Sequence, residues 1–197
     1  PVRYISNNSS GKMGYALAAA AVDAGAITTL VSGPVALAPP DRIRFLSVQS
    51  AEQMLEQCIE LVPECDIFIG CAAVADYRPA TVENQKIKKA QDEMALQLVR
   101  NPDIVSAVAA SKHRPYTVGF AAETNNVVAY ARDKMQRKGL DMMVANDVSN
   151  QAIGFNSDNN AVTVLWHDGE KILELASKAS IARHIVHLIA HQTRKNN

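Results

Sequence analysis

Hydrophobic and polar positions divide the chain into short and long segments that follow one another in a regular order. Short continuous apolar runs predict buried strands, and longer stretches with apolar residues every three or four positions predict helices. Strands are predicted at residues 27–32, 43–48, 66–72, 116–121 and 141–145, and helices at 12–24, 51–62, 102–110 and 126–138. Continuous apolar strands are typical of a parallel sheet buried on both faces. This order therefore predicts an α/β fold with a doubly wound, Rossmann-like, mostly parallel sheet flanked by helices.

The last part of the chain departs from this order. Apolar segments at 161–166 and 171–175 flank Asp168-Gly169, a dipeptide that favours a hairpin turn, and residues 178–191 have the spacing of an amphipathic helix. We expect a C-terminal antiparallel hairpin added to the sheet. The hairpin at 161–175 is also our candidate for a contact between two copies in a homodimer.

Composition and charge narrow the class of protein. With 197 residues and 48% hydrophobic content, residues 1–197 are expected to form one domain around one substantial core. Lys+Arg and Asp+Glu both number 20, so no net positive field favours nucleic acid or a membrane surface. Three cysteines without a C-x-x-C pair, and no apolar stretch of transmembrane length, are typical of a reduced cytoplasmic protein.

A polar turn precedes the first predicted helix and is the best candidate for an anion site. Asn7, Ser9, Ser10 and Gly11 lie where backbone N–H groups are free and the helix dipole favours negative charge. The spacing matches neither a Walker loop nor G-x-G-x-x-G. On the turn alone, an ordinary serine-capped helix is an equally good interpretation.

Further candidates follow the ends of the predicted strands, where ligands bind in such sheets. Small residues and then Asp76 follow strand 66–72, and a carboxylate beside phosphates is a natural Mg²⁺ ligand. Phe120 ends another strand and is placed to stack on a base. A polar segment at about 83–94, with lysines at 86, 88 and 89, is the candidate for a mobile flap over the site.

Two other functional classes remain open at this point. Tyr130 and Lys134 match the Y-x-x-x-K pair of NAD(P)-dependent short-chain reductases, although the N-terminal dinucleotide glycines are missing. A non-catalytic nucleotide-binding module also fits the α/β pattern. Lys134 and Lys138 are i,i+4 neighbours on one helix face, which is equally typical of a solubilising surface.

Taken together, the ordered motifs resemble the phosphopantothenoylcysteine synthetase family, the ligase part of a bacterial bifunctional protein of coenzyme A biosynthesis. The motifs are RYISNNSSGKMG at 3–14, GCAAVADYRP at 70–79, KIKK at 86–89, NPDIV at 101–105, VGFAAETNN at 118–126, ANDVS at 145–149 and GFNSDNNAV at 154–162. The resemblance implies a cytoplasmic homodimer that joins 4'-phosphopantothenate to cysteine. The reaction would pass through an acyl-cytidylate made from CTP with Mg²⁺, releasing pyrophosphate and then CMP.

The resemblance also implies roles for single residues. Asn7 would stabilise the acyl-nucleotide and the tetrahedral species, Lys86 would contact the reacting groups from the flap, and Asp76 would hold Mg²⁺ on the triphosphate. Contacts to the nucleotide would come from Ser9, Ser10, Gly11, Gly70, Cys71, Ala72, Asp76, Lys86, Asn101, Pro102, Asp103, Ile104, Phe120, Lys134 and Lys138. Contacts to phosphopantothenate would come from Arg3, Asn7, Ala72 and Ala73.

The sequence departs from the family pattern in two ways. The strand that normally precedes Pro1 is missing, so we expect a sheet without the family's first strand. The flavin-dependent decarboxylase part is also missing. We therefore expect no FMN in this chain, and a decarboxylase domain as its fusion partner in the full-length protein.

Overall fold

Within the described part of the chain, the central sheet has five strands, and it confirms the predicted parallel sheet with an added antiparallel hairpin. The computed structural model describes residues 5–7, 9–82, 85, 94–123, 126–147 and 157–195. Strands β3 (Ile67–Gly70), β6 (Tyr116–Glu123) and β7 (Met142–Asp147) pair in parallel. The hairpin of β8 (Asn159–Trp166) and β9 (Gly169–Ser177) continues the sheet antiparallel, in the order β3-β6-β7-β8-β9.

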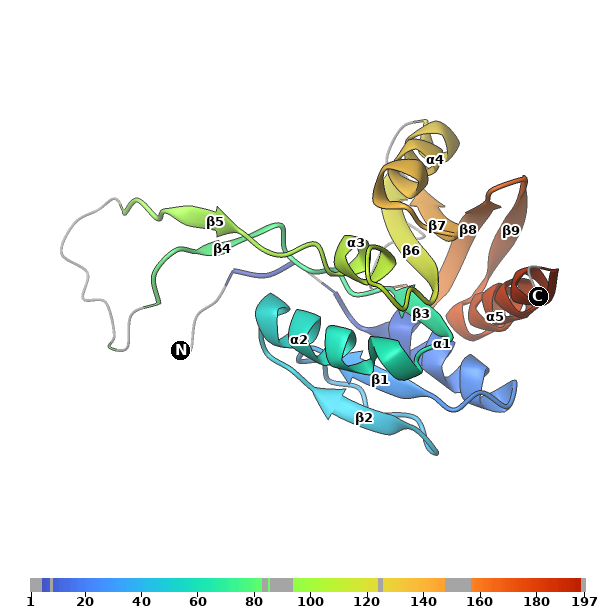
Figure 1. The fold of residues 1–197 in the computed structure, drawn as a ribbon, viewed down its shortest axis with the longest axis horizontal. Coiled ribbons are helices and arrows are strands. Elements are labelled where there is room, and N and C mark those ends of the chain that lie inside the picture. The colour runs from blue at the N-terminus through green and yellow to red at the C-terminus, as the bar shows by residue number, and fades with distance from the viewer. Residues whose placement is uncertain are drawn as a thin grey trace.

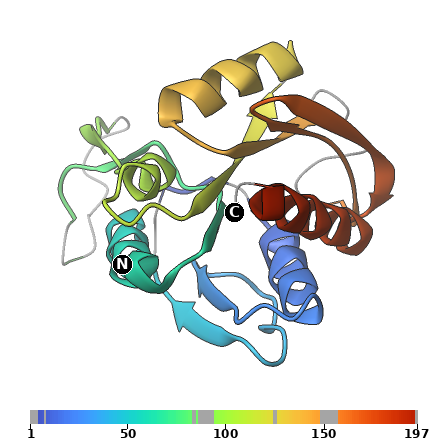
Figure 2. The same ribbon diagram turned by 45° about the vertical axis from the view of Figure 1, so that its right-hand side comes forward.

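Helices cover both faces of this sheet (Figures 1 and 2). Helices α1 (Lys12–Asp23) and α5 (Lys178–Lys195) bury their apolar stripes against one face, together with Val118, Met142 and Val144. Helices α3 (Ile104–Ala109) and α4 (Val127–Lys138) cover the opposite face over Met143 and Ala145. Side chains of one strand point alternately to the two faces, so consecutive residues of β7 belong to different cores.

A smaller parallel pair lies beside the central sheet. It consists of β1 (Thr29–Ser32) and β2 (Arg44–Ser47), and it is followed by α2 (Ala51–Leu61) and the 3₁₀ turn η1 (Val62–Glu64). Within the described residues β1 does not pair with β3, and a cavity of about 3040 Å³ is lined by residues of both strands.

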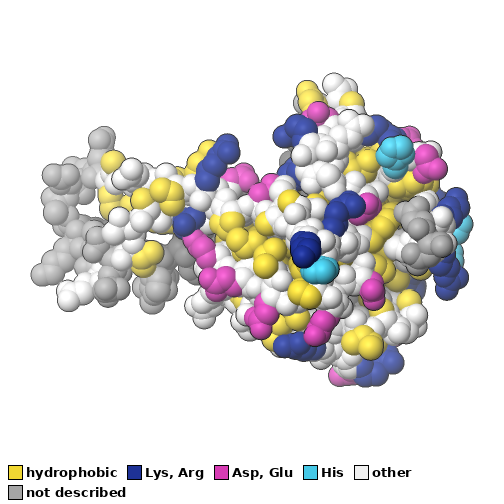
Figure 3. Space-filling model, viewed as in Figure 1, with side chains coloured by type: hydrophobic (Ala, Val, Ile, Leu, Met, Phe, Trp, Pro, Cys, Tyr) yellow, Lys and Arg dark blue, Asp and Glu magenta, His cyan; other side chains and the backbone are white. Residues whose placement is uncertain are grey.

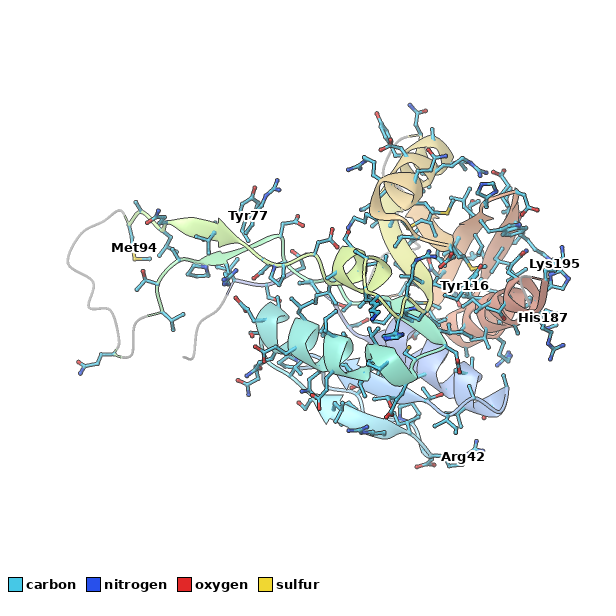
Figure 4. The ribbon with its side chains drawn as sticks, in the orientation of Figure 1. Arg42, Tyr77, Met94, Tyr116, His187 and Lys195 are labelled. Atoms are coloured by element: carbon cyan, nitrogen blue, oxygen red, sulfur yellow. The ribbon has the colours of Figure 1, made fainter. Side chains whose placement is uncertain are left out.

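A narrow arm projects from the body of the molecule (Figures 1 and 3). It contains the antiparallel pair β4 (Tyr77–Pro79) and β5 (Leu98–Arg100). Tyr77 lies near its base and Met94 near its far end (Figure 4). Exposed apolar side chains are concentrated on this arm: Tyr77, Val82, Met94, Leu96, Leu98 and Val99. Most of the predicted flap, residues 83, 84 and 86–93, lies outside the described residues.

The described helices include none with the length and apolar character needed to span a bilayer.

Gly119 lets the segment after α4 approach β6 closely. A Cβ at this position would meet Leu140 Cδ1 at 2.6 Å, with Met143 also in contact, whereas a Cβ at Gly14 in α1 would meet nothing within 4 Å. We predict that Gly119→Ala lowers the free energy of unfolding by about 1–3 kcal/mol through overpacking. The matched change Gly14→Ala should raise it by roughly 0.5–1 kcal/mol, because glycine is costly inside a helix. Urea unfolding of both variants measures this, and equal effects of the same sign would contradict the packing.

Candidate functional site

The cavity between the two sheets continues into a cleft at the carboxyl ends of the strands. Most of the residues that the sequence marked as site candidates line it: Asn7, Ser9, Ser10, Gly11, Gly70, Cys71, Ala72, Ala73, Asp76, Asn101, Ile104, Phe120 and Lys134. Pro102, Asp103 and Lys138 do not belong to the lining. Arg3 and Lys86 lie outside the described residues.

The N-terminus of α1 faces this cleft without a side-chain cap and without an acidic residue in its first turn. Gly11 precedes the helix with φ of 74°, and a Cβ there would meet Val35 Cγ1 at 2.9 Å, so the turn requires glycine. The Ser9 hydroxyl accepts a long bond of 3.4 Å from Gly11 N–H, and the Ser10 hydroxyl accepts one of 3.5 Å from Lys12 N–H. An anion is electrostatically favoured at such a terminus.

Three consecutive carbonyl groups after β3 are bound by asparagines. Asn7 Nδ2 donates to Val74 O at 3.2 Å, and Asn101 Nδ2 donates to Ala75 O at 2.8 Å. The backbone N–H of Asn101 donates to Asp76 O at 2.8 Å. These bonds join the loop before α1, the segment after β3 and the segment before α3, which are far apart in the sequence. They fix a stretch of backbone that lines the cleft.

Arg78 supports this arrangement from the base of the arm. Its Nη1 donates to Arg100 O at 2.6 Å and to Asn101 Oδ1 at 3.3 Å, and its guanidinium forms an ion pair with Glu52 of α2. The sequence analysis did not assign a role to Arg78. The signal was present in GCAAVADYRP, where an arginine follows the candidate metal ligand, but its partners are too distant in sequence to be recognised.

Asp76 carries the candidate metal-binding carboxylate. Its side chain is exposed and lines the cleft, while its backbone oxygen is held by Asn101. The described residues contain no group of three or more His, Cys, Asp or Glu side chains suited to hold a metal ion alone. A single carboxylate fits Mg²⁺ that is bound mainly by substrate phosphates.

Lys138 forms an ion pair with a residue that the sequence placed in the same nucleotide site. Its Nζ lies 2.7 Å from Asp103 Oδ2, and Asp103 also caps α3 by accepting from Ser106 N–H at 3.1 Å. Burial pushes the pKa of Asp103 upward, but the bonds from Lys138 and Ser106 outweigh it and lower the pKa overall. Lys138 thus joins α4 to α3, and Lys134, one turn earlier, lines the cleft.

A second group of charged residues borders the cleft on the side of α1 and α5. Lys12 Nζ lies 2.7 Å from Asp158 Oδ1, and the buried Lys178 donates to Ser157 O. Desolvation and the nearby Lys12 lower the pKa of Lys178, although Asp158 opposes this. Sequence reasoning missed Lys178 and Asp158. Asp158 lies within the motif GFNSDNNAV, which was the one signal available.

The structure does not assemble the reductase pair in the cleft. Tyr130 is 54% exposed on α4 and does not line the cavity, whereas Lys134 does. A tyrosine that acts as a proton donor must face the bound substrate, so this geometry does not favour the reductase.

A mostly parallel sheet flanked by helices, with a cleft at the carboxyl ends of its parallel strands, defines a Rossmann-like α/β protein. The sequence pattern of the family described as DNA/pantothenate metabolism flavoprotein, C-terminal domain, matches residues 1–193. The chain belongs to this family.

Relatives with known names agree with this assignment. The chain is 58% identical over 182 residues to the coenzyme A biosynthesis bifunctional protein CoaBC of Escherichia coli (strain K12), covering 90% of this chain and 45% of that protein. It is 55% identical over 189 residues to CoaBC of Vibrio vulnificus (strain YJ016), covering 94% and 47%. The chain therefore spans about half the length of these relatives.

A solved structure shares the fold over almost the whole chain. The crystal structure of the C-terminal domain of a coenzyme A biosynthesis bifunctional protein CoaBC matches with a TM-score of 0.83 and 40% sequence identity. The match covers 99% of this chain and 89% of that one.

The three thiols of the chain are held in their protonated form. Burial raises the pKa of Cys58 to about 11 and that of Cys71 to about 12, and it also raises the pKa of Cys65. All three are free cysteines. A thiol is a nucleophile only as its thiolate, so these residues are suited to packing rather than covalent chemistry.

We predict that native Cys58 and Cys71 react with iodoacetamide at pH 8 at least tenfold more slowly than in the urea-unfolded chain. The folded state also holds these protons more tightly than the unfolded state, whose thiols ionise near pH 9.0. The free energy of unfolding should therefore be unaffected by these thiols below pH 9 and fall as the pH rises from 9 toward 11. Mass spectrometry and urea unfolding against pH measure the two effects, and rapid native labelling of Cys71 would contradict them.

Proposed function

We propose that this chain is a CTP-dependent ligase of coenzyme A biosynthesis that joins 4'-phosphopantothenate to L-cysteine. The family and the CoaBC relatives support a place in coenzyme A biosynthesis. The observation that carries the ligase assignment is the cleft itself, where an uncapped helix N-terminus, an exposed carboxylate and a neutral amide donor lie on one lining. These groups suit phosphate handling and acyl transfer without a protein nucleophile.

The proposed reaction has two steps. The carboxylate of phosphopantothenate is a poor electrophile, so it first attacks the α-phosphate of CTP, giving an acyl-cytidylate and releasing pyrophosphate. The amine of cysteine then attacks the acyl carbon, loses a proton, and displaces CMP as the amide forms. Both steps depend on positioning and on the stabilisation of negative charge. The protonated thiols of this chain are consistent with the absence of a covalent enzyme intermediate.

The nucleotide is assigned to the loop before α1 and to the side of α3 and α4. In this proposal the N–H groups around Ser9, Ser10 and Gly11 bind phosphates. Backbone at 70–72 and 101–104 frames the nucleotide together with Phe120, and Lys134 neutralises phosphate charge directly. Lys138 acts through Asp103, which it holds at the start of α3. When bound with CTP, Mg²⁺ on Asp76 would offset the charge of the triphosphate.

Asn7 is assigned to the acyl group. One N–H of its side-chain amide binds Val74 O, and an amide nitrogen carries a second N–H that remains available to an oxyanion. Arg3, Ala72 and Ala73 are proposed contacts of phosphopantothenate, and Lys86 is proposed to approach the reacting groups. A neutral donor suits this place because it stabilises developing charge without binding the ground-state carboxylate too tightly.

We also propose that the chain acts as a homodimer and, in the full-length protein, beside a decarboxylase domain. The CoaBC relatives, of which this chain spans about half, support the second part. Two surfaces expose apolar side chains for a dimer. The hairpin exposes Ile172 and Leu175, whereas the arm exposes the larger set named above.

Ligand-induced stabilisation separates the ligase from the reductase. We predict that CTP with Mg²⁺ at 100 times its Kd raises the free energy of unfolding by roughly 2.7 kcal/mol, because it binds only the folded state. NADPH at the same concentration should have no measurable effect. Thermal unfolding with each nucleotide measures this, and a larger shift with NADPH would overturn the proposed function.

Two asparagine variants separate the half-reactions. Asn7→Asp removes the donor to Val74 O and in addition puts a negative charge where the oxyanion forms. We therefore expect pyrophosphate release to fall about as much as in Asn101→Asp, and amide formation to fall about 10²-fold or more beyond that. Asn101→Asp removes the donor that holds Ala75 O and should slow both steps together. Pyrophosphate and amide are measured with phosphopantothenate and CTP, first without and then with cysteine. Equal losses in both steps for Asn7→Asp would refute the assigned role of Asn7.

A further inference from the structure

Arg78 holds the base of the arm against two other segments that border the cleft. It lies in β4, two residues after Asp76, and its side chain is half-buried. Its Nη1 donates to Arg100 O at 2.6 Å and to Asn101 Oδ1 at 3.3 Å, while its Nε pairs with Glu52 in the first turn of α2. One planar guanidinium therefore joins β4, the end of β5 and the start of α2.

The orientation of the Asn101 carboxamide depends on this guanidinium. Asn101 donates through Nδ2 to Ala75 O at 2.8 Å, and its Oδ1 faces Arg78. A guanidinium has only donors, and a backbone carbonyl has only an acceptor. A reversed carboxamide would place nitrogen against nitrogen and oxygen against oxygen, and both bonds would be lost. Arg78 and Ala75 O together select one of the two amide orientations.

The backbone that Asn101 holds contains the candidate metal ligand. The N–H of Asn101 donates to Asp76 O at 2.8 Å, and its side chain binds the preceding carbonyl, that of Ala75. Asp103, two residues further on, caps α3 and pairs with Lys138 at 2.7 Å. A turned Asn101 would release Ala75 O and loosen the backbone that carries Asp76.

We infer that Arg78 is a positioning residue for the proposed ligase reaction and that it acts through Asn101 rather than on a substrate. This inference rests on the proposed function. By fixing the Asn101 carboxamide, Arg78 keeps the backbone at residues 74–76 where both half-reactions need it. Arg78 belongs to the arm, so a displacement of the arm changes the geometry of the cleft. A misplacement of about 1 Å can cost roughly 10²-fold in rate.

Two conservative variants separate the bonds of Nη1 from the ion pair. Arg78→Lys keeps a positive charge beside Glu52, but a lysine ends before the position of Nη1 and does not hold Arg100 O and Asn101 Oδ1 together. We expect kcat for pyrophosphate release and for amide formation to fall together by about tenfold or more, with the KM of CTP changed less than about threefold. Glu52→Gln keeps the Nη1 bonds, and its two rates should stay within about twofold of wild type. Wild-type rates in Arg78→Lys, or equal losses in the two variants, would overturn the inference.

Arg114 is the matched control for a loss of stability. Its side chain is 40% exposed, against 39% for Arg78, and it also donates to a backbone carbonyl, Gly139 O at 2.8 Å, and pairs with a carboxylate, that of Asp141 at 2.7 Å. Arg114 does not belong to the lining of the cleft. Both Arg78→Ala and Arg114→Ala should lower the melting temperature by a few degrees, but only Arg78→Ala should lower kcat. Equal losses of kcat in the two variants would contradict a positioning role.

A double-mutant cycle tests whether Arg78 acts through Asn101. Asn101→Ala removes the carboxamide and leaves Arg78 nothing to orient. The double variant R78A/N101A should therefore release pyrophosphate about as fast as the slower single variant, because the two changes remove one shared interaction. Effects that multiply would show that Arg78 acts independently of Asn101, and would overturn the inference.

The same measurements separate this inference from the proposed function. Pyrophosphate and amide are measured on the full chain with phosphopantothenate, CTP and Mg²⁺, first without and then with cysteine. If the wild-type chain carries out both steps and Arg78→Ala keeps the wild-type kcat, this inference fails and the ligase proposal stands. If the wild-type chain carries out neither step, both fail together.

Discussion

The site depends on one constraint: three consecutive carbonyl groups after β3 have to be bound from outside their own segment. Asn7 and Asn101 supply the donors for Val74, Ala75 and Asp76. Backbone carbonyls at the end of a strand that turns into a loop have no ladder partner, so side chains or water must satisfy them. The two asparagines do this and thereby bring the loop before α1 and the start of α3 to the same edge of the sheet. Arg78 fixes Asn101 in turn, so the base of the arm is part of the same network.

Charged groups lie on two sides of the cleft. On the side of α3 and α4, Lys138 and Asp103 form a short ion pair that ties the two helices together, and Lys134 borders the cleft. On the side of α1 and α5, an uncapped helix N-terminus is followed by the Lys12–Asp158 pair and the buried Lys178. The proposed reaction needs such a division, because an activated acid has to be held between its nucleotide and an incoming amine.

The sequence predicted the elements well because their signals are local. The continuous apolar run at 66–72 and the hairpin turn Asp168-Gly169 both correspond to the observed strands β3 and β8–β9. Most of the candidate residues at strand ends also line the cleft, since carboxyl ends of parallel strands meet at one edge. The placement of Arg78 and Lys178 was not predictable in this way. Their partners depend on contacts between distant segments, and periodicity alone does not define these.

The central claim is that the loop before α1 and the segment after β3 together hold an acyl-cytidylate. A crystal structure of the chain with CTP, Mg²⁺ and phosphopantothenate, without cysteine, tests it most directly. The account predicts the α-phosphate within hydrogen-bond distance of the backbone at residues 9–11, the acyl oxygen near Asn7, and the pantothenate chain beside Ala72 and Ala73. A nucleotide bound elsewhere, for example in the smaller pocket beside Arg114 and Arg132, with Asn7 out of reach of the ligand, would contradict it.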